Sequence, residues 1–286
     1  MSNAVPTLLT ALVDDAAVFP PGSAALTDAV PAHAEHRRSW FAQLIGPLLI
    51  PVADRRAFRA LAPPGTAVGL VGDPATVEAA LGDLPAGTCQ LESPVAKRGE
   101  DPLPGIERLA TLSRKSEEPL RLYLEVPLAW GLMSALDALA QLRAEGLPVA
   151  AKFRTGGLAA ELFPSPAELA SVICACRDRD LPFKLTAGLH HAVRHTDAET
   201  GLVHHGFLNV LAAVLAAADG GDPGDLAPIL GATEPLPLAD RVAPELGRER
   251  PLWVGFGSCS VKDPVADLVT LGLLQRPRPT PAEPAR

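Results

Sequence analysis

The sequence has few cysteines, few aromatic residues and no long apolar run. Its four cysteines among 286 residues do not make the disulfide framework of a small secreted domain. Cys174 and Cys176 are two positions apart, so they lie on different faces of a helix and are interpreted as free core thiols. No apolar stretch reaches the roughly 18 residues of a membrane span. The longest one, at 207–218, is expected to form a helix, and we expect no membrane partner.

Runs of basic residues and a signal peptide are also absent. The formal net charge of -8 and the scattered cations argue against a nucleic-acid partner. The N-terminal segment from Met1 to Pro6 lacks the charged and apolar regions of a secretory signal. We therefore expect a cytoplasmic protein whose partner is a small molecule, and the sequence leaves a homo-oligomer open.

The chain does contain one repeated rhythm of apolar strand, loop and helix. The strands are near-continuous apolar runs, typical of parallel strands that are covered by helices, and they are expected at 9–14, 44–52, 67–72, 88–93, 120–126, 149–154, 182–187 and 252–257. The helices are expected at 25–42, 53–62, 74–83, 104–115, 131–145, 165–179, 205–218 and 262–274. Three of them begin where a capping residue precedes proline, at Asp73-Pro74, Ser165-Pro166 and Asp263-Pro264.

Eight such units predict an α/β protein with a single-domain (β/α)8 barrel over residues 1–274, since this fold typically takes about 250 residues. A doubly wound open sheet that binds a nucleotide typically has a glycine-rich phosphate-binding turn after its first strand. Residues 13–22 do not contain such a turn. Residues 219–250 are rich in proline, glycine and acids, and are interpreted as an irregular insertion with a short helix at 225–231. The proline-rich tail 275–286 is expected to be disordered.

Charged side chains occupy the ends of the predicted strands, where barrel enzymes place their catalytic groups. Lys152 and Lys184 lie in consecutive strands, although a buried ammonium group is costly unless it is paired. The alternation of side chains along a strand puts four polar pairs on the inner face, namely Gln90 with Glu92, Tyr123 with Glu125, Lys152 with Arg154, and Lys184 with Thr186. The first strand offers Asp14 or Asp15, without indicating which one faces the site.

We therefore expect Lys152, Lys184, Glu92 and Glu125 to be catalytic, with the two ammonium groups within about 8 Å of each other. A second cation lowers the pKa of a lysine, and a neutral amine is a nucleophile. A buried ion-pair network without any chemistry is the alternative interpretation.

Substrate contacts are expected from the neighbouring strand ends and loops. The residues are Arg154, Thr186, His190, His191, Gly257 and Ser258. A guanidinium group holds a carboxylate or phosphate bidentately. The turn from Gly257 to Cys259 precedes a helix N-terminus and predicts a phosphate-binding site, although a strand-to-helix turn without a ligand would use the same residues.

The two lysine segments resemble class I aldolases of the deoxyribose-phosphate aldolase type. That family has a Schiff-base lysine on strand 6 in a Lys-Thr-x-Thr-Gly-like stretch, and a second lysine on strand 7 followed by small residues and glycine. The stretches Lys152-Phe-Arg-Thr-Gly156 and Lys184-Leu-Thr-Ala-Gly188 are similar. The resemblance implies a Schiff base on Lys152 and a pKa-lowering role for Lys184. Arg154 stands where the family prefers a small hydroxyl residue, and Glu92 or Glu125 would have to replace its strand-end aspartate.

The sequence thus predicts an enzyme acting on a small, anionic, carbonyl-bearing metabolite, and specifically an aldolase-like lyase of a carbon-carbon bond that uses no cofactor and no metal. One alternative is an enolising lyase or isomerase, because Asp73, Glu92 and Glu125 opposite two lysines look like the layout of the enolase superfamily, in which Mg²⁺ stabilises an enediolate. Asp73 also has the features of a helix cap. The other alternative is a ligand-binding barrel without turnover.

Overall fold

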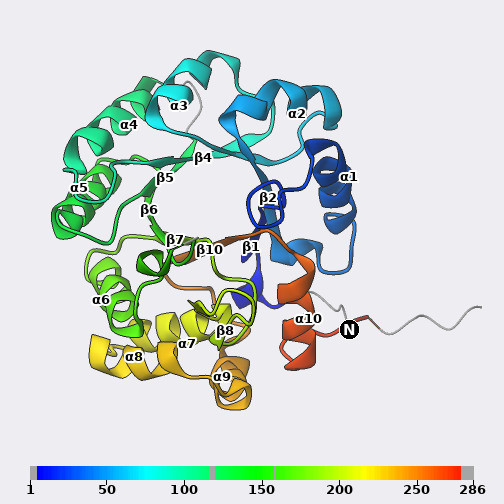
Figure 1. The fold of residues 1–286 in the computed structure, drawn as a ribbon, viewed down its shortest axis with the longest axis vertical. Coiled ribbons are helices and arrows are strands. Elements are labelled where there is room, and N and C mark those ends of the chain that lie inside the picture. Colours follow the sequence, from blue (N-terminus) through cyan, green and yellow to red (C-terminus); the bar gives the residue numbers. More distant parts are fainter. Residues whose placement is uncertain (1–4, 116–119, 158, 278–286) are drawn as a thin grey trace, which may run out of the picture.

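A closed barrel of eight parallel strands forms the centre of the protein and is surrounded by helices (Figure 1). The structure is a computed structural model that describes residues 5–115, 120–157 and 159–277. The barrel strands are β1 (Val13–Asp15), β2 (Ile45–Pro51), β3 (Val68–Val71), β4 (Thr88–Pro94), β5 (Arg121–Glu125), β6 (Val149–Arg154), β7 (Phe183–Thr186) and β10 (Trp253–Ser258). The predicted (β/α)8 barrel is confirmed.

The helices follow the strands in chain order. They are α1 (Leu26–His36), α2 (Arg55–Leu61), α3 (Pro74–Ala80), α4 (Leu103–Lys115), α5 (Leu132–Ala144), α6 (Pro166–Arg177), α7 (Phe207–Ala218), α8 (Pro223–Gly231), α9 (Pro235–Val242) and α10 (Lys262–Thr270). A small antiparallel hairpin, β8 (His195–Thr196) with β9 (Val203–His204), lies in the loop after β7. In the described part of the chain, no helix is both long and apolar enough to cross a bilayer.

The capping signals in the sequence are correct at two of three sites. Asp73 caps α3, and Ser165 caps α6 in a capping box with Glu168. The expected cap at Asp263 is wrong, because α10 begins at Lys262 and Asp263 lies inside its first turn.

The segment 219–250 is more helical than expected. It forms α8 and α9, and Asp222 caps α8 in a second capping box. Leu226 and Leu230 are fully buried, and α8 packs against α6 and α7. The irregular insertion is therefore a pair of helices that covers the outer layer of the barrel. Most of the expected disordered tail lies outside the described residues.

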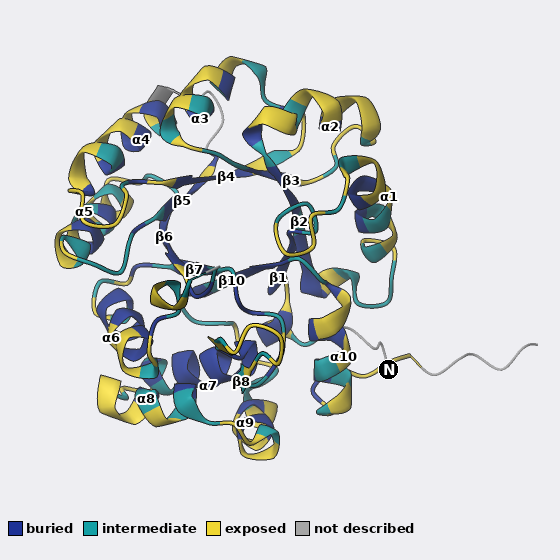
Figure 2. Ribbon diagram, viewed as in Figure 1, coloured by how far each residue is buried: buried dark blue, intermediate teal, exposed yellow. Residues whose placement is uncertain are grey.

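Burial separates the two faces of each strand. The strands are buried almost throughout, whereas the helices are exposed on their outer side (Figure 2). Leu91, Phe153 and Leu185 belong to the apolar core, and each of them directly follows or precedes a buried charged or polar residue. Because successive side chains of a strand point to opposite faces, the apolar set packs against the helices and the charged set points into the barrel.

Candidate active site

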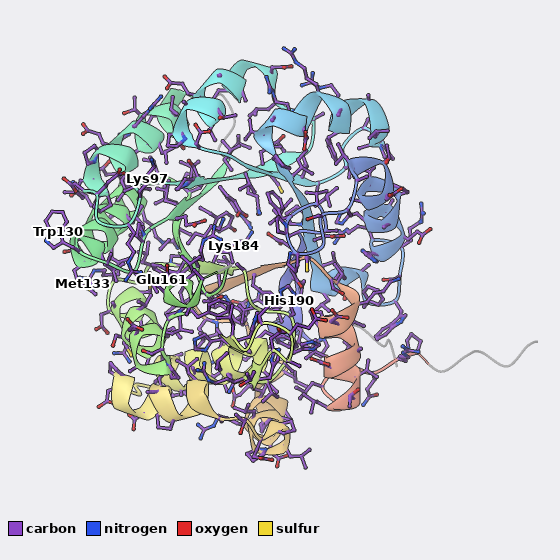
Figure 3. The ribbon with its side chains drawn as sticks, viewed as in Figure 1. Lys97, Trp130, Met133, Glu161, Lys184 and His190 are labelled. Atoms are coloured by element: carbon purple, nitrogen blue, oxygen red, sulfur yellow. The ribbon has the colours of Figure 1, made fainter. Side chains whose placement is uncertain are left out.

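Four charged side chains from four strands meet inside the barrel. They are Asp14 on β1, Glu92 on β4, Lys152 on β6 and Lys184 on β7, and all four are buried. Figure 3 labels Lys184 within the ring of strands. The interior of such a barrel is usually filled by branched aliphatic side chains. A buried charge cluster in this position therefore has to be compensated by internal ion pairs and hydrogen bonds.

Glu92 bridges the two lysines. Its Oε2 lies 2.8 Å from Lys152 Nζ, and its Oε1 lies 2.5 Å from Lys184 Nζ. Lys184 Nζ also pairs with Asp14 Oδ2. Both ammonium groups contact one carboxylate. The prediction that the two ammonium groups lie within about 8 Å of each other is therefore confirmed.

Gln90 and two glycines hold the acidic groups in place. Gln90 Nε2 donates hydrogen bonds to Asp14 Oδ2 at 2.8 Å and to Glu92 Oε1 at 3.0 Å. A Cβ atom at Gly46 would lie 1.9 Å from Asp14 Oδ1, and one at Gly69 would lie 2.8 Å from Gln90 Cγ. The absence of a side chain at both positions makes room for this network. The sequence did not assign a site role to Gln90, although its inward parity was visible.

The charge network continues to the mouth of the barrel through Glu125 and Arg154. Lys152 Nζ lies 3.0 Å from Glu125 Oε2, and both Arg154 Nε and Nη2 lie 3.1 Å from Glu125 Oε1. The exposed fraction of the side chain is 17% for Glu125 and 44% for Arg154, against 4% for Lys152. Positive and negative groups therefore alternate from the buried Lys184 to the solvent-exposed Arg154.

A pocket of about 330 Å³ opens beside this outer end of the network. It is lined by Glu125, Arg154 and Arg98 together with apolar residues from the loops after β4, β5 and β6. Glu161, another residue of its wall, is labelled in Figure 3 between α5 and α6. The pocket thus presents two guanidinium groups next to the carboxylate that contacts Lys152.

The protonation state of the lysines differs from the expectation. Burial disfavours their charged forms, but the neighbouring carboxylates outweigh it, and the pKa of both Lys152 and Lys184 is raised. The predicted lowering of the Lys152 pKa is wrong for the free protein, because Glu92 and Glu125 act more strongly on Lys152 than Lys184 does. Burial also opposes the charge of Glu92, yet the two lysines lower the pKa of Glu92 to about 2. Both lysines are therefore ammonium groups at neutral pH.

The two loop histidines contact residues in and before α10. His190 Nδ1 lies 3.5 Å from Cys259 Sγ, and Figure 3 shows His190 on the side of α10. His191 Nδ1 lies 3.3 Å from Asp267 Oδ2 on α10. Thr186 is half-buried, and its backbone oxygen accepts a hydrogen bond from Thr155 N–H. These contacts do not bring His190 or His191 to the lysines, and their substrate role stays a prediction.

Some of the polar groups in the turn after β10 bind one another, and the phosphate site predicted at Gly257 and Ser258 stays a prediction. Ser258 is buried, and its hydroxyl donates to Ser260 O at 2.7 Å and accepts from Ser260 N–H at 3.3 Å. Asp263 N–H in turn donates to Ser260 Oγ. Gly257 is buried beside Leu49 and Ala16. The N–H groups of Ser260 and Asp263 already donate to hydroxyls of the turn and are not free to bind an anion there, whereas Arg98 and Arg154 are exposed at the pocket.

Asp73 does not belong to the metal site that an enolase-like arrangement would require. Asp73 is exposed, and its Oδ1 accepts hydrogen bonds from the N–H groups of Ala75 and Thr76, both at 3.0 Å. It is therefore a helix cap and does not join Glu92 and Glu125. Both oxygens of Glu92 are occupied by lysine ammonium groups.

No family model, curated protein or solved structure matches this chain. The functional interpretation consequently rests on the chemistry and geometry of the barrel interior.

Proposed function

We propose that the protein is a lyase that cleaves or forms a carbon-carbon bond of a small anionic carbonyl compound through a Schiff base on Lys152. The observation that carries the proposal is the position of Lys152, between Glu92 and Glu125 and next to a pocket with two arginines. Well-packed apolar residues in place of a whole buried ion pair are often as stable or more stable, and strongly perturbed pKa values are concentrated at functional sites. A catalytic role accounts for this cluster better than a purely structural one.

Substrate binding is the step that frees the amine of Lys152. An anionic substrate group that binds Arg154 competes with Glu125, whose Oε1 now holds the guanidinium. Once Glu125 has lost this cation, it becomes a stronger base and accepts a proton from Lys152 Nζ, 3.0 Å away. The products of this transfer are a neutral amine and a neutral carboxylic acid, so no net charge is buried.

The amine then attacks the substrate carbonyl carbon, and the resulting carbinolamine loses its hydroxyl. Glu125 returns its proton to this leaving hydroxyl, so that water and a positively charged iminium form and Glu125 is again a carboxylate. In the cleavage direction, Glu125 takes the proton of the substrate's β-hydroxyl group, the adjacent carbon-carbon bond breaks, and its electron pair moves to the iminium nitrogen. Glu92 stays ionised between the lysines. Lys184 stays a cation, and its charge disfavours the protonated form of Lys152.

Borohydride trapping tests the proposal directly. The protein is incubated with small 2-oxo acids and with phosphorylated aldehydes and ketones, reduced, digested and analysed by mass spectrometry. We expect an adduct on the peptide that contains Lys152, and its loss in Lys152→Met. Lys262→Met is the matched control, because Lys262 is exposed at the start of α10, outside the barrel. Equal labelling of exposed lysines, or no adduct with a compound that the protein turns over, would contradict the proposal.

A further inference from the structure

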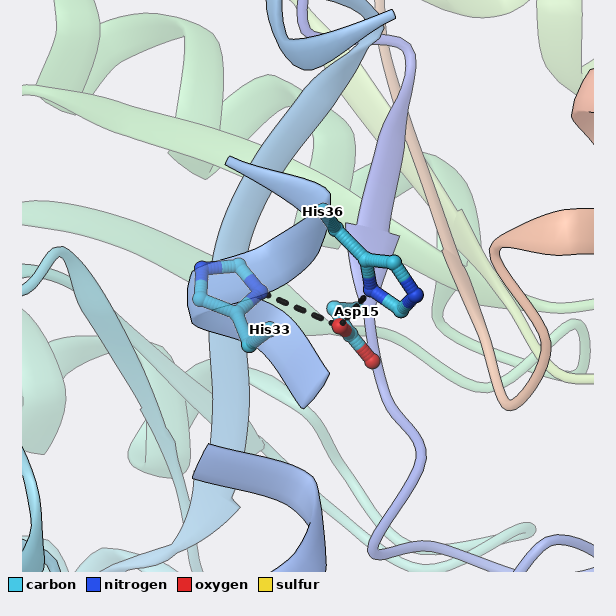
Figure 4. Close-up of side chains that lie close together, drawn as sticks. All are labelled: Asp15, His33 and His36. Atoms are coloured by element: carbon cyan, nitrogen blue, oxygen red, sulfur yellow. Dashed lines mark hydrogen bonds and ion pairs between the residues drawn. The ribbon is translucent and has the colours of Figure 1, made fainter. Parts of the chain in front are cut away.

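Asp15 belongs to a second group of side chains, outside the barrel interior. It directly follows Asp14 on β1, so its side chain points to the opposite face of the strand, toward α1. Figure 4 shows its carboxylate between the imidazoles of His33 and His36. Both His33 Nδ1 and His36 Nδ1 face the same oxygen, Asp15 Oδ2, at 3.0 and 3.1 Å.

Local structure explains why these three groups converge. His33 and His36 are three positions apart on α1, one turn of the helix, so their side chains share a face. Ala17 N–H donates a hydrogen bond to Asp15 Oδ1 at 3.3 Å. This contact fixes the carboxylate so that its other oxygen faces the histidines, as second-shell partners do at metal sites.

We propose that Asp15, His33 and His36 bind one divalent transition-metal ion, with zinc as the ion of reference. One carboxylate oxygen and two imidazole nitrogens are the donor set of many zinc and non-haem iron sites. Zinc binds such donors at about 2.0–2.1 Å, which places tetrahedral ligand atoms about 3.3 Å apart. The separations of 3.0 and 3.1 Å from the carboxylate are slightly shorter than this, and all three ligand atoms lie within 4.8 Å of one another.

Within the described ranges, no other three residues among histidine, cysteine, aspartate and glutamate bring ligand atoms this close together. Asp15 and His33 are 2% and 1% exposed, whereas His36 is 15% exposed. Three protein ligands leave a fourth position for water, and the side of His36 provides access to it.

Binding of the ion would link a helix to a barrel strand. The ion would join the last turn of α1 to β1, one residue from Asp14, which pairs with Lys184. It would hold the strand that supplies an acid to the barrel network, but from the helical side. The inference is independent of the proposed lyase activity, and the ion takes no part in the proposed Schiff-base steps.

Cobalt and zinc binding to the untagged protein tests this site. The chain is treated with a chelator, dialysed and titrated with Co²⁺. We expect one ion per chain, a visible absorption typical of four-coordinate cobalt, and displacement by Zn²⁺. Loss of a residue that only supports a metal ligand typically weakens metal binding about 10–100-fold. Replacement of His36, a direct ligand, by glutamine should weaken binding more than that. His195→Gln is the matched control, because His195 stacks on His204 in the loop after β7.

A measurement on the wild-type protein avoids any dependence on the folding of variants. Long-range ¹H–¹⁵N spectra report each imidazole nitrogen, and Zn²⁺ should shift Nδ1 of two histidines only. The site would be refuted if the reloaded wild-type protein bound no ion, or if binding were unchanged in His36→Gln. It would also be refuted if binding were lost in His195→Gln instead, or if Zn²⁺ shifted nitrogens of other histidines.

Discussion

Replacement of Glu92 by glutamine removes the one carboxylate that contacts both buried lysines while it preserves the shape of the side chain. Lys152 then keeps only Glu125, and Lys184 keeps only Asp14. Breaking a buried ion pair by removal of one partner costs about 3–5 kcal/mol. With an unfolding entropy of about 2.1 cal/mol/K per residue, a chain of this length should lose roughly 5–8 °C in Tm.

The pKa of Glu92 leads to a similar magnitude and adds a pH dependence. Its folded-state pKa is about 2, against an ordinary value of 4.5. Because the pKa is lower in the folded state, the stabilisation is fully present above pH 4.5 and is lost as the pH falls toward 2. The difference is worth about 3 kcal/mol at neutral pH. Wild-type protein should therefore lose this stability on acidification, and Glu92→Gln should lack that part of the dependence.

Thermal unfolding followed by circular dichroism at pH 7 and pH 3 measures both effects. Glu78→Gln is a suitable control, since Glu78 forms an exposed ion pair with Arg108 and should contribute less than about 1 kcal/mol. If Glu92→Gln and Glu78→Gln unfolded at the same temperature at pH 7, the buried charge network would not have the energetic role inferred here.

Three further substitutions test other parts of the site. Lys184→Met removes the cation that partly opposes the two carboxylates beside Lys152, so the already raised pKa of Lys152 should rise further. Borohydride trapping should then slow at neutral pH and recover at higher pH, and an unchanged pH profile would exclude this role. Arg154→Leu should raise KM for an anionic substrate and shift the free energy of unfolding by less than about 1 kcal/mol, because Arg154 is exposed at the pocket. Gly46→Ala should destabilise the fold by about 1–3 kcal/mol, because the new Cβ would overlap the carboxylate of Asp14. The matched control Gly82→Ala has no atom within 4 Å of the new Cβ, and equal stability of these two alanine variants would contradict the crowding argument.

Local sequence patterns were sufficient to predict the barrel and most of its inward-facing charges. Periodicity and capping signals are local properties, so they located eight strands and most helices to within a few residues. They also placed Glu92, Glu125, Lys152 and Lys184 on the inner face, because side chains alternate strictly along a strand. The same capping signal was present at Asp222-Pro223, but the glycine and proline around it favoured an irregular segment, and α8 was predicted too short.

How these groups act on one another could not be predicted before the packing of the elements was known. The strand β1 has three residues, which is too short for alternation to show whether Asp14 or Asp15 faces inward. The pKa of Lys152 depends on its distances to two acids and one cation, and such distances follow from strand register around the closed barrel. The contact of His33 and His36 with Asp15 depends on how α1 packs against β1. Electrostatic interactions and metal coordination vary steeply with separations of a few ångströms, and residues far apart in the chain acquire such separations only when the elements pack.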